Sequence, residues 1–146
     1  MLYIFLDFDG VLHTHNGKRF SLVKNFENVM RCYPEVKIVF STSWREYSNL
    51  ENMKKFLPET LHNQCVGLTP FFKKDIKHTR YEEIMHYVKE NNIDNWLAID
   101  DLSVLFPPGC ENLFLVNGSE GISPSVAKML KKKIKYLVRK SKAQQH

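Results

Sequence analysis

Near its N-terminus the chain reads Leu2-Tyr-Ile-Phe-Leu-Asp-Phe-Asp-Gly10, a short apolar run that ends in two acidic residues and a glycine. A run rich in aromatic and β-branched residues is typical of a buried strand, here over residues 2–6. Similar runs follow at residues 36–40, 65–68, 96–99 and 113–116. Between and after them, helical spacing of apolar residues predicts helices over 21–32, 46–56, 79–91 and from 123 onward. This alternation predicts an α/β protein with a mostly parallel, five-stranded sheet flanked by helices.

Composition indicates one globular domain. The chain has 146 residues, of which 43% are apolar and 25% charged, as in ordinary soluble proteins. We expect a single domain over residues 1–140 that ends in a basic helix, followed by a disordered basic tail at 141–146. No apolar run is long enough to span a membrane. Three widely spaced cysteines argue against a disulfide framework or a structural zinc site, and so favour the cytoplasm.

Charge is distributed unevenly along the chain. Eight of the 21 basic residues lie between Lys128 and Lys142, where no acidic residue occurs. Residues 1–127 therefore carry 13 basic and 16 acidic groups, a net charge of −3. The basic segment could contact a phosphate backbone, or it could be a solvated helix face.

Acidic residues follow two of the predicted strands. Asp7 and Asp9 end the first strand, and because side chains alternate along a strand they share one side of it. Asp100 and Asp101 end the strand at 96–99. If both strand ends open onto one crevice, these carboxylates converge, and all-oxygen ligands favour a hard cation such as Mg²⁺. Two unrelated acidic strand ends are the alternative.

Hydroxyl and basic residues supply a second candidate group. Ser41, Thr42 and Ser43 follow the strand at 36–40, where hydroxyls and backbone N–H groups suit phosphate oxygens. The alternative is that one of them caps the following turn. Arg45 and Arg80 lie near predicted helix starts, where a cation opposes the helix dipole, although a solvated arginine is the default interpretation.

These motifs together resemble those of the haloacid dehalogenase (HAD) superfamily of phosphotransferases. Asp7-Phe-Asp-Gly-Val-Leu12 is similar to motif I, Ser41 to motif II, Arg80 to the motif III cation and Asp100-Asp101 to motif IV. The segments Ser-Thr-Ser-Trp-Arg-Glu and Arg-Tyr-Glu-Glu-Ile further resemble the HAD domain of RNA-repair ("Swiss Army knife") proteins. Ser-Trp-Arg is also similar to the Ser-Gly-Arg of polynucleotide-kinase phosphatase domains, but Trp44 replaces the glycine, which leaves open whether Ser41 or Ser43 binds the phosphoryl group.

The resemblance implies a Rossmann-like HAD fold and a role for each residue. Asp7 would be the nucleophile that forms an aspartyl-phosphate, and Asp9 the general acid and base. Mg²⁺ would be held by Asp7, the Asp9 carbonyl and Asp100, with Asp101 bound directly or one layer further out. Ser41 and Arg80 would hold the phosphoryl oxygens.

The intervals between the motifs leave no room for a cap domain, so we expect an open site that large substrates can reach. The preferred hypothesis is a Mg²⁺-dependent phosphomonoester hydrolase, a nucleic acid repair enzyme acting on RNA or DNA ends or on nucleotides. A small-metabolite phosphatase and a non-catalytic module that binds phosphate or protein are the alternatives. His13 and His15 could touch substrate, and Phe20, Trp44 and Phe71-Phe72 could stack on a base, but loop exposure and core packing are the commoner uses of such residues. No membrane partner is expected, and the oligomeric state is left open.

Overall fold

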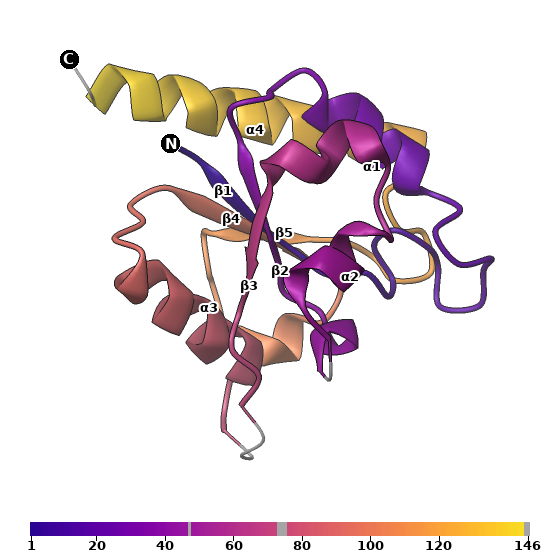
Figure 1. Ribbon diagram of the computed structural model, residues 1–146, viewed down its shortest axis with the longest axis horizontal. Coiled ribbons are helices and arrows are strands. Elements are labelled where there is room, and N and C mark those ends of the chain that lie inside the picture. The colour runs from indigo at the N-terminus through magenta and orange to yellow at the C-terminus, as the bar shows by residue number, and fades with distance from the viewer. Residues whose placement is uncertain (47, 73–75, 145–146) are drawn as a thin grey trace.

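Five short strands form one parallel sheet in the computed structural model, which describes residues 1–46, 48–72 and 76–144 (Figure 1). The order across the sheet is β3-β2-β1-β4-β5, and every neighbouring pair is parallel. The strands are β1 (Tyr3–Leu6), β2 (Lys37–Phe40), β3 (Cys65–Leu68), β4 (Trp96–Asp100) and β5 (Leu113–Leu115). The predicted α/β class and five-stranded sheet are confirmed, and over the described residues no cap domain interrupts the fold.

Helices cover both faces of the sheet. Figure 1 shows α1 and α4 on one side and α3 on the other. The helices are α1 (Val23–Met30), α2 (Leu50–Lys54), α3 (Thr79–Glu90) and α4 (Pro124–Gln144), and the short 3₁₀ turns are η1 (Ser43–Arg45), η2 (Glu59–Gln64) and η3 (Ser103–Leu105).

Alternate side chains of the central strand enter two separate apolar clusters. Ile4 and Leu6 belong to the larger cluster, with apolar residues of α1, α2 and α4, whereas Phe5 belongs to the smaller one, with residues of α3. Both faces of β1 are therefore buried, which explains why this strand reads as a continuous apolar run.

Two predicted helices are shorter in the structure. The helix expected over 46–56 is reduced to α2. Residues 43–45 form the separate turn η1, and α2 begins only after Asn49, whose side chain caps it by accepting a hydrogen bond from the backbone N–H of Asn52 at 2.9 Å. The helix expected from residue 21 begins at Val23, and no side chain caps it.

The last helix is anchored at both ends. Pro124 is its first residue, and the Ser123 hydroxyl accepts a hydrogen bond from the backbone N–H of Val126 at 3.3 Å. Near its other end, Ser141 accepts a hydrogen bond from the N-terminal amine of Met1 at 2.9 Å. Since α4 continues to Gln144, it extends into the segment 141–146 predicted to be disordered; residues 145 and 146 lie outside the described residues.

This course places the basic residues of α4 relative to the sheet. The helix begins after β5 and returns to the edge of the sheet where β1 begins, next to the N-terminus (Figure 1). Its last basic residues therefore lie at the opposite edge from the carboxyl ends of the strands. Over the described residues, no helix combines the length and the apolar character needed to cross a lipid bilayer.

The strand order creates a crevice at one place along the sheet. The chain moves outward from β1 to β2 and β3, then returns to the other side of β1 with β4. In open α/β sheets, ligands bind beyond the carboxyl ends of the strands at such a reversal. Here this position lies between the ends of β1 and β4.

We predict that α4 is part of the domain core. The Ile134 side chain is fully buried against the sheet, so Ile134→Ala should lower the free energy of unfolding by about 2–5 kcal/mol. The matched variant Lys132→Ala, on the exposed face of the same helix, should stay within about 0.5 kcal/mol of wild type. Urea denaturation measures both; equal effects would contradict the packing described for α4.

Candidate active site

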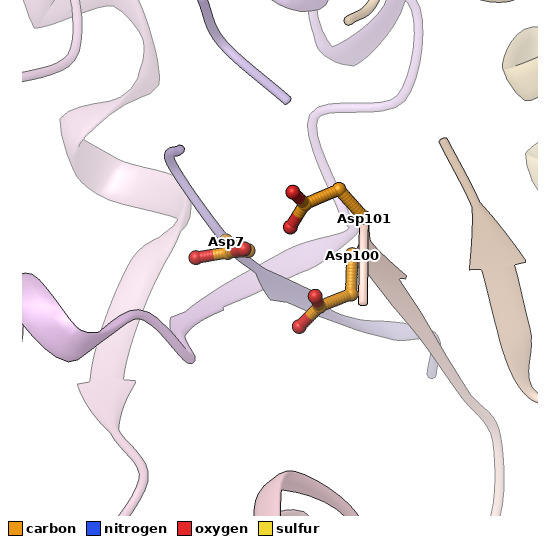
Figure 2. Close-up of side chains that lie close together, drawn as sticks. All are labelled: Asp7, Asp100 and Asp101. Carbon is orange, nitrogen blue, oxygen red and sulfur yellow. The ribbon is translucent and has the colours of Figure 1, made fainter. Parts of the chain in front are cut away.

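Three carboxylates converge at the carboxyl ends of β1 and β4. Oxygen atoms of Asp7, Asp100 and Asp101 all lie within 4.8 Å of one another, and Figure 2 shows the three side chains around one point. Their side chains are only 7%, 2% and 4% exposed, respectively. The structure thus brings together three of the four acidic residues singled out in the sequence, and they are the ones that could hold a metal ion.

Strand register explains why these residues meet. Leu6 pairs with Ile99, and the N–H of Asp7 donates to the Ile99 carbonyl at 3.1 Å, so the next residues along both strands lie side by side. Backbone amides then hold the carboxylates: the N–H of Phe8 donates to Asp7 Oδ1 at 2.8 Å, and that of Leu102 to Asp100 Oδ1 at 3.0 Å.

The electrostatics of this cluster favour a bound cation. Burial, reinforced by the charge of Asp100, raises the pKa of Asp7 well above its usual range. Burial also raises the pKa of Asp100, while Arg80 opposes the increase. Like charges this close do not ionise together without compensation. A buried group of oxygen ligands fits a hard divalent ion such as Mg²⁺.

Arg80 lies directly against the cluster. Its Nη1 donates to Asp100 Oδ2 at 2.7 Å and lies 3.6 Å from Asp7 Oδ1. Burial disfavours the charged guanidinium, but the carboxylates of Asp100, Asp7 and Glu83 prevail and raise the pKa of Arg80. The predicted phosphate ligand is therefore present in the site as a cation, close to the candidate nucleophile.

Arg45 has a different environment from the one predicted. It is buried, its Nη2 donates to Glu83 Oε1 at 2.6 Å, and its other hydrogen bonds go to backbone carbonyls. Those carbonyls belong to Thr42, Thr69 and Pro70. Burial lowers the pKa of Arg45, an effect that Glu83 opposes. We correct the prediction: Arg45 ties together the ends of β2 and β3, and its donors are engaged there.

Glu83 is a site residue that the sequence analysis missed. Its Oε1 accepts from Arg45 and lies 3.8 Å from Arg80 Nε, while its Oε2 accepts from the Phe72 N–H at 2.8 Å. It is almost fully buried between the two arginines. Its position three residues after Arg80, on the same face of α3, was the available signal.

The three hydroxyl residues after β2 occupy distinct environments. Ser41 Oγ is buried and has no hydrogen-bond partner, which is costly unless a ligand supplies one. The Thr42 hydroxyl instead accepts from the Trp44 N–H at 3.4 Å and caps η1, so Thr42 follows the capping alternative. Ser43 is exposed. Of Ser41 and Ser43, the first has the unsatisfied hydroxyl that a phosphate oxygen would complete.

Asp9 is separated from the other three acidic residues. Its side chain is 53% exposed, and its carboxylate contacts His13 Nε2 at 2.8 Å and Trp44 Nε1 at 2.9 Å. His13, one of the two loop histidines given no role from sequence, is buried. Since the Asp9 carboxylate is not in the cluster, the structure leaves only its backbone carbonyl for the predicted metal contact.

The turn after Asp9 requires glycine. Gly10 has a φ of +75°, and a Cβ there would lie 2.4 Å from Asp101 Oδ2 and 2.8 Å from His15 Nε2. His15, exposed in the following loop, has its Nε2 2.6 Å from the same Asp101 oxygen. Glycine therefore permits both the left-handed backbone and the close approach of the Asp101 carboxylate.

Comparison with known proteins identifies a related family. Residues 3–127 match the model of a family described as the HAD domain in Swiss Army Knife RNA repair proteins. No curated protein and no solved structure matches the chain.

We predict that the carboxylate cluster destabilises the metal-free protein. A carboxyl whose pKa is raised by folding contributes most stability below its ordinary pKa, and loses that contribution as the pH rises through the raised value. Asp7→Asn should therefore raise the Tm at neutral pH in chelator, by about 2–4 °C per kcal/mol, and flatten its decline with pH. Mg²⁺ should raise the Tm of wild type much more than that of the variant. Differential scanning calorimetry tests this, and a variant less stable than wild type in chelator would contradict it.

Proposed function

Because the chain belongs to the family of HAD domains found in Swiss Army Knife RNA repair proteins, we propose that it is a Mg²⁺-dependent phosphomonoester hydrolase acting on nucleic-acid ends or nucleotides. The observation that carries the proposal is the buried cluster of Asp7, Asp100 and Asp101 at the strand-order reversal. Arg80 lies against this cluster, and the unsatisfied Ser41 hydroxyl follows the neighbouring strand.

Asp7 is the proposed nucleophile. One carboxylate oxygen attacks phosphorus, the bond from phosphorus to the ester oxygen breaks, and an aspartyl-phosphate forms. The Phe8 N–H holds one oxygen of this carboxylate, which leaves the other to react. Water then attacks phosphorus, releasing inorganic phosphate and restoring the Asp7 carboxylate.

Asp9 is the proposed general acid and base. It gives its proton to the departing ester oxygen and takes one from the attacking water in the second step. Its exposure, unlike the burial of Asp7, suits a group that meets both substrate and solvent.

Ser41 and Arg80 are the proposed ligands of the phosphoryl oxygens. Arg80 Nη1 is 3.6 Å from Asp7 Oδ1, so it lies beside the carboxylate group that would attack phosphorus. The Ser41 hydroxyl would gain in the phosphoryl group the partner that it otherwise lacks. Fixed donors of this kind stabilise the transition state electrostatically.

Mg²⁺ would be held by Asp7, Asp100 and the Asp9 carbonyl, with Asp101 as a further carboxylate of the cluster. When bound, it neutralises charge on the phosphoryl oxygens. The His15 contact with Asp101 Oδ2 leaves the second oxygen of that carboxylate free to face the cluster.

The proposed substrate is a phosphorylated nucleic-acid end because the site is not covered by an inserted domain over the described residues and because the family is described by RNA repair. Three unpaired cysteines support a reducing compartment such as the cytoplasm.

We predict that Asp7→Asn abolishes Mg²⁺-dependent phosphate release, with a loss of at least about 10³-fold, because an amide cannot act as the nucleophile. Phosphate release is measured on mononucleotides, 3′- and 5′-phosphorylated oligonucleotides, sugar phosphates and a phosphopeptide. Oligonucleotide ends or nucleotides should be the best substrates for wild type. Undiminished turnover by the variant would refute the mechanism, and a preference for sugar phosphates would refute the substrate class.

We also predict that basic residues at the two ends of α4 differ in effect. Lys128 and Lys131 line a groove with Asn25 of α1 near the start of α4. Asn25 is fixed there because its side-chain amide donates to the Ile122 carbonyl at 2.9 Å. Lys140 and Lys142, by contrast, lie toward the far edge of the sheet. Lys128→Gln with Lys131→Gln should lower kcat/KM for oligonucleotides and reduce its salt slope by about 1–2. The matched pair Lys140→Gln with Lys142→Gln should have little effect. Equal salt slopes for both pairs would show that the groove does not bind the backbone.

A further inference from the structure

We propose that His13 and Trp44 are positioning residues that hold the Asp9 carboxylate in place for proton transfer. This inference rests on the proposed function, because it assumes that Asp9 is the general acid and base. We call the two side chains the Asp9 clamp.

The clamp binds both oxygens of one carboxylate. His13 Nε2 lies 2.8 Å from Asp9 Oδ1, and Trp44 Nε1 donates to Asp9 Oδ2 at 2.9 Å. A side chain that is 53% exposed could be solvated by water alone and would then sample several rotamers. Two fixed donors restrict it to one orientation.

The hydrogen bonding of His13 determines which ring nitrogen donates. The backbone N–H of Phe20 donates to His13 Nδ1 at 3.2 Å. A neutral imidazole has one N–H, so an accepting Nδ1 places the proton on Nε2, which faces Asp9. His13 Nε2 is therefore the donor to the Asp9 carboxylate.

The backbone at Phe20 is shaped for this contact. Phe20 has a φ of 59°, in the left-handed region that a bulky residue rarely adopts. The Phe20 ring also packs edge-on against the His13 ring, with centroids 5.3 Å apart. Such a backbone persists only where its surroundings compensate for it, and here its N–H orients the imidazole.

Trp44 is held in place by other aromatic rings. Its ring centroid lies 5.7 Å from that of Phe8, 5.4 Å from Phe20 and 5.2 Å from Phe56. The Arg19 guanidinium lies 5.1 Å from the Trp44 ring centroid. Indole has a single N–H donor, and in this packed orientation that N–H donates to the Asp9 carboxylate. The tryptophan that stands in place of the glycine in Ser-Trp-Arg therefore supplies a hydrogen-bond donor to Asp9.

The clamp leaves the carboxyl group able to exchange a proton. Each carboxylate oxygen has two lone-pair positions, and each accepts one hydrogen bond from the clamp. One position on each oxygen remains for the proton that Asp9 gives or takes. Because a misplaced catalytic group costs up to about 10²-fold in rate, the clamp should matter most where the leaving group needs that proton.

The test compares two substrates of similar shape. Departure of p-nitrophenolate from p-nitrophenyl phosphate needs little protonation, whereas the alkoxide of benzyl phosphate requires a proton. The value of kcat/KM reports steps up to departure of the leaving group. Trp44→Phe, which keeps the ring but removes the donor, should lower kcat/KM about 10–100-fold on benzyl phosphate and less than about threefold on p-nitrophenyl phosphate. His13→Leu should do the same, and His13→Gln, whose amide nitrogen can donate to Asp9, should recover most of the loss.

Controls separate this inference from the proposed function. Asp9→Asn should give the same leaving-group pattern at larger amplitude, and Lys132→Ala should match wild type. If wild type releases no phosphate with Mg²⁺, the proposed function fails. If Asp9→Asn gives the pattern but Trp44→Phe loses activity equally on both substrates, or not at all, only the clamp is refuted. Trp44→Phe keeps the test decisive even if His13→Leu does not fold.

Discussion

Three carboxylates with oxygens within 4.8 Å of one another are the constraint on which the rest of this structure depends. The parallel register of β1 and β4 forces Asp7 and Asp100 together, and burial strengthens their repulsion because little water screens it. Arg80 offsets part of that repulsion. The folded protein thus holds an arrangement that is unfavourable by itself, and a bound cation would make it favourable.

A chain of alternating charges carries this constraint across the sheet. Arg80 contacts the cluster on one side and Glu83 on the other, and Glu83 in turn binds Arg45. The Arg45 guanidinium hydrogen-bonds carbonyl groups that follow β2 and β3. The network therefore connects the carboxyl ends of β1 and β4 to those of β2 and β3 through α3. The residues that balance the charge of the site also fix the positions of the loops that surround it.

The sequence was sufficient for features that depend on local pattern. Short apolar runs located the five strands, and because parallel strands end at one edge, acidic residues at two strand ends could be expected to meet. Arg45 and Trp44 could not be placed in this way, since their partners are distant in sequence and are brought to them by packing. The Trp44 contact joins residues 35 apart in sequence, and the Arg45–Glu83 pair joins residues 38 apart. A run of hydroxyls beside an arginine is compatible with phosphate binding and with capping, and the structure distinguishes its members: Ser41 is unsatisfied, Thr42 caps η1 and Ser43 is exposed.

Asp7 and Asp9 show how one short segment places two carboxylates in different surroundings. Asp7 is buried against like charges, whereas Asp9, two residues later, is 53% exposed between the donors of His13 and Trp44. The two carboxylates have different environments because the strand ends at Leu6 and the chain turns at Gly10. The left-handed backbone of Gly10 directs the following loop back over the site. That loop brings His13 to Asp9 and His15 to Asp101. Carboxylates in such different surroundings suit the proposed roles of nucleophile and proton carrier, and the difference between them follows from where the strand stops and the glycine turn begins.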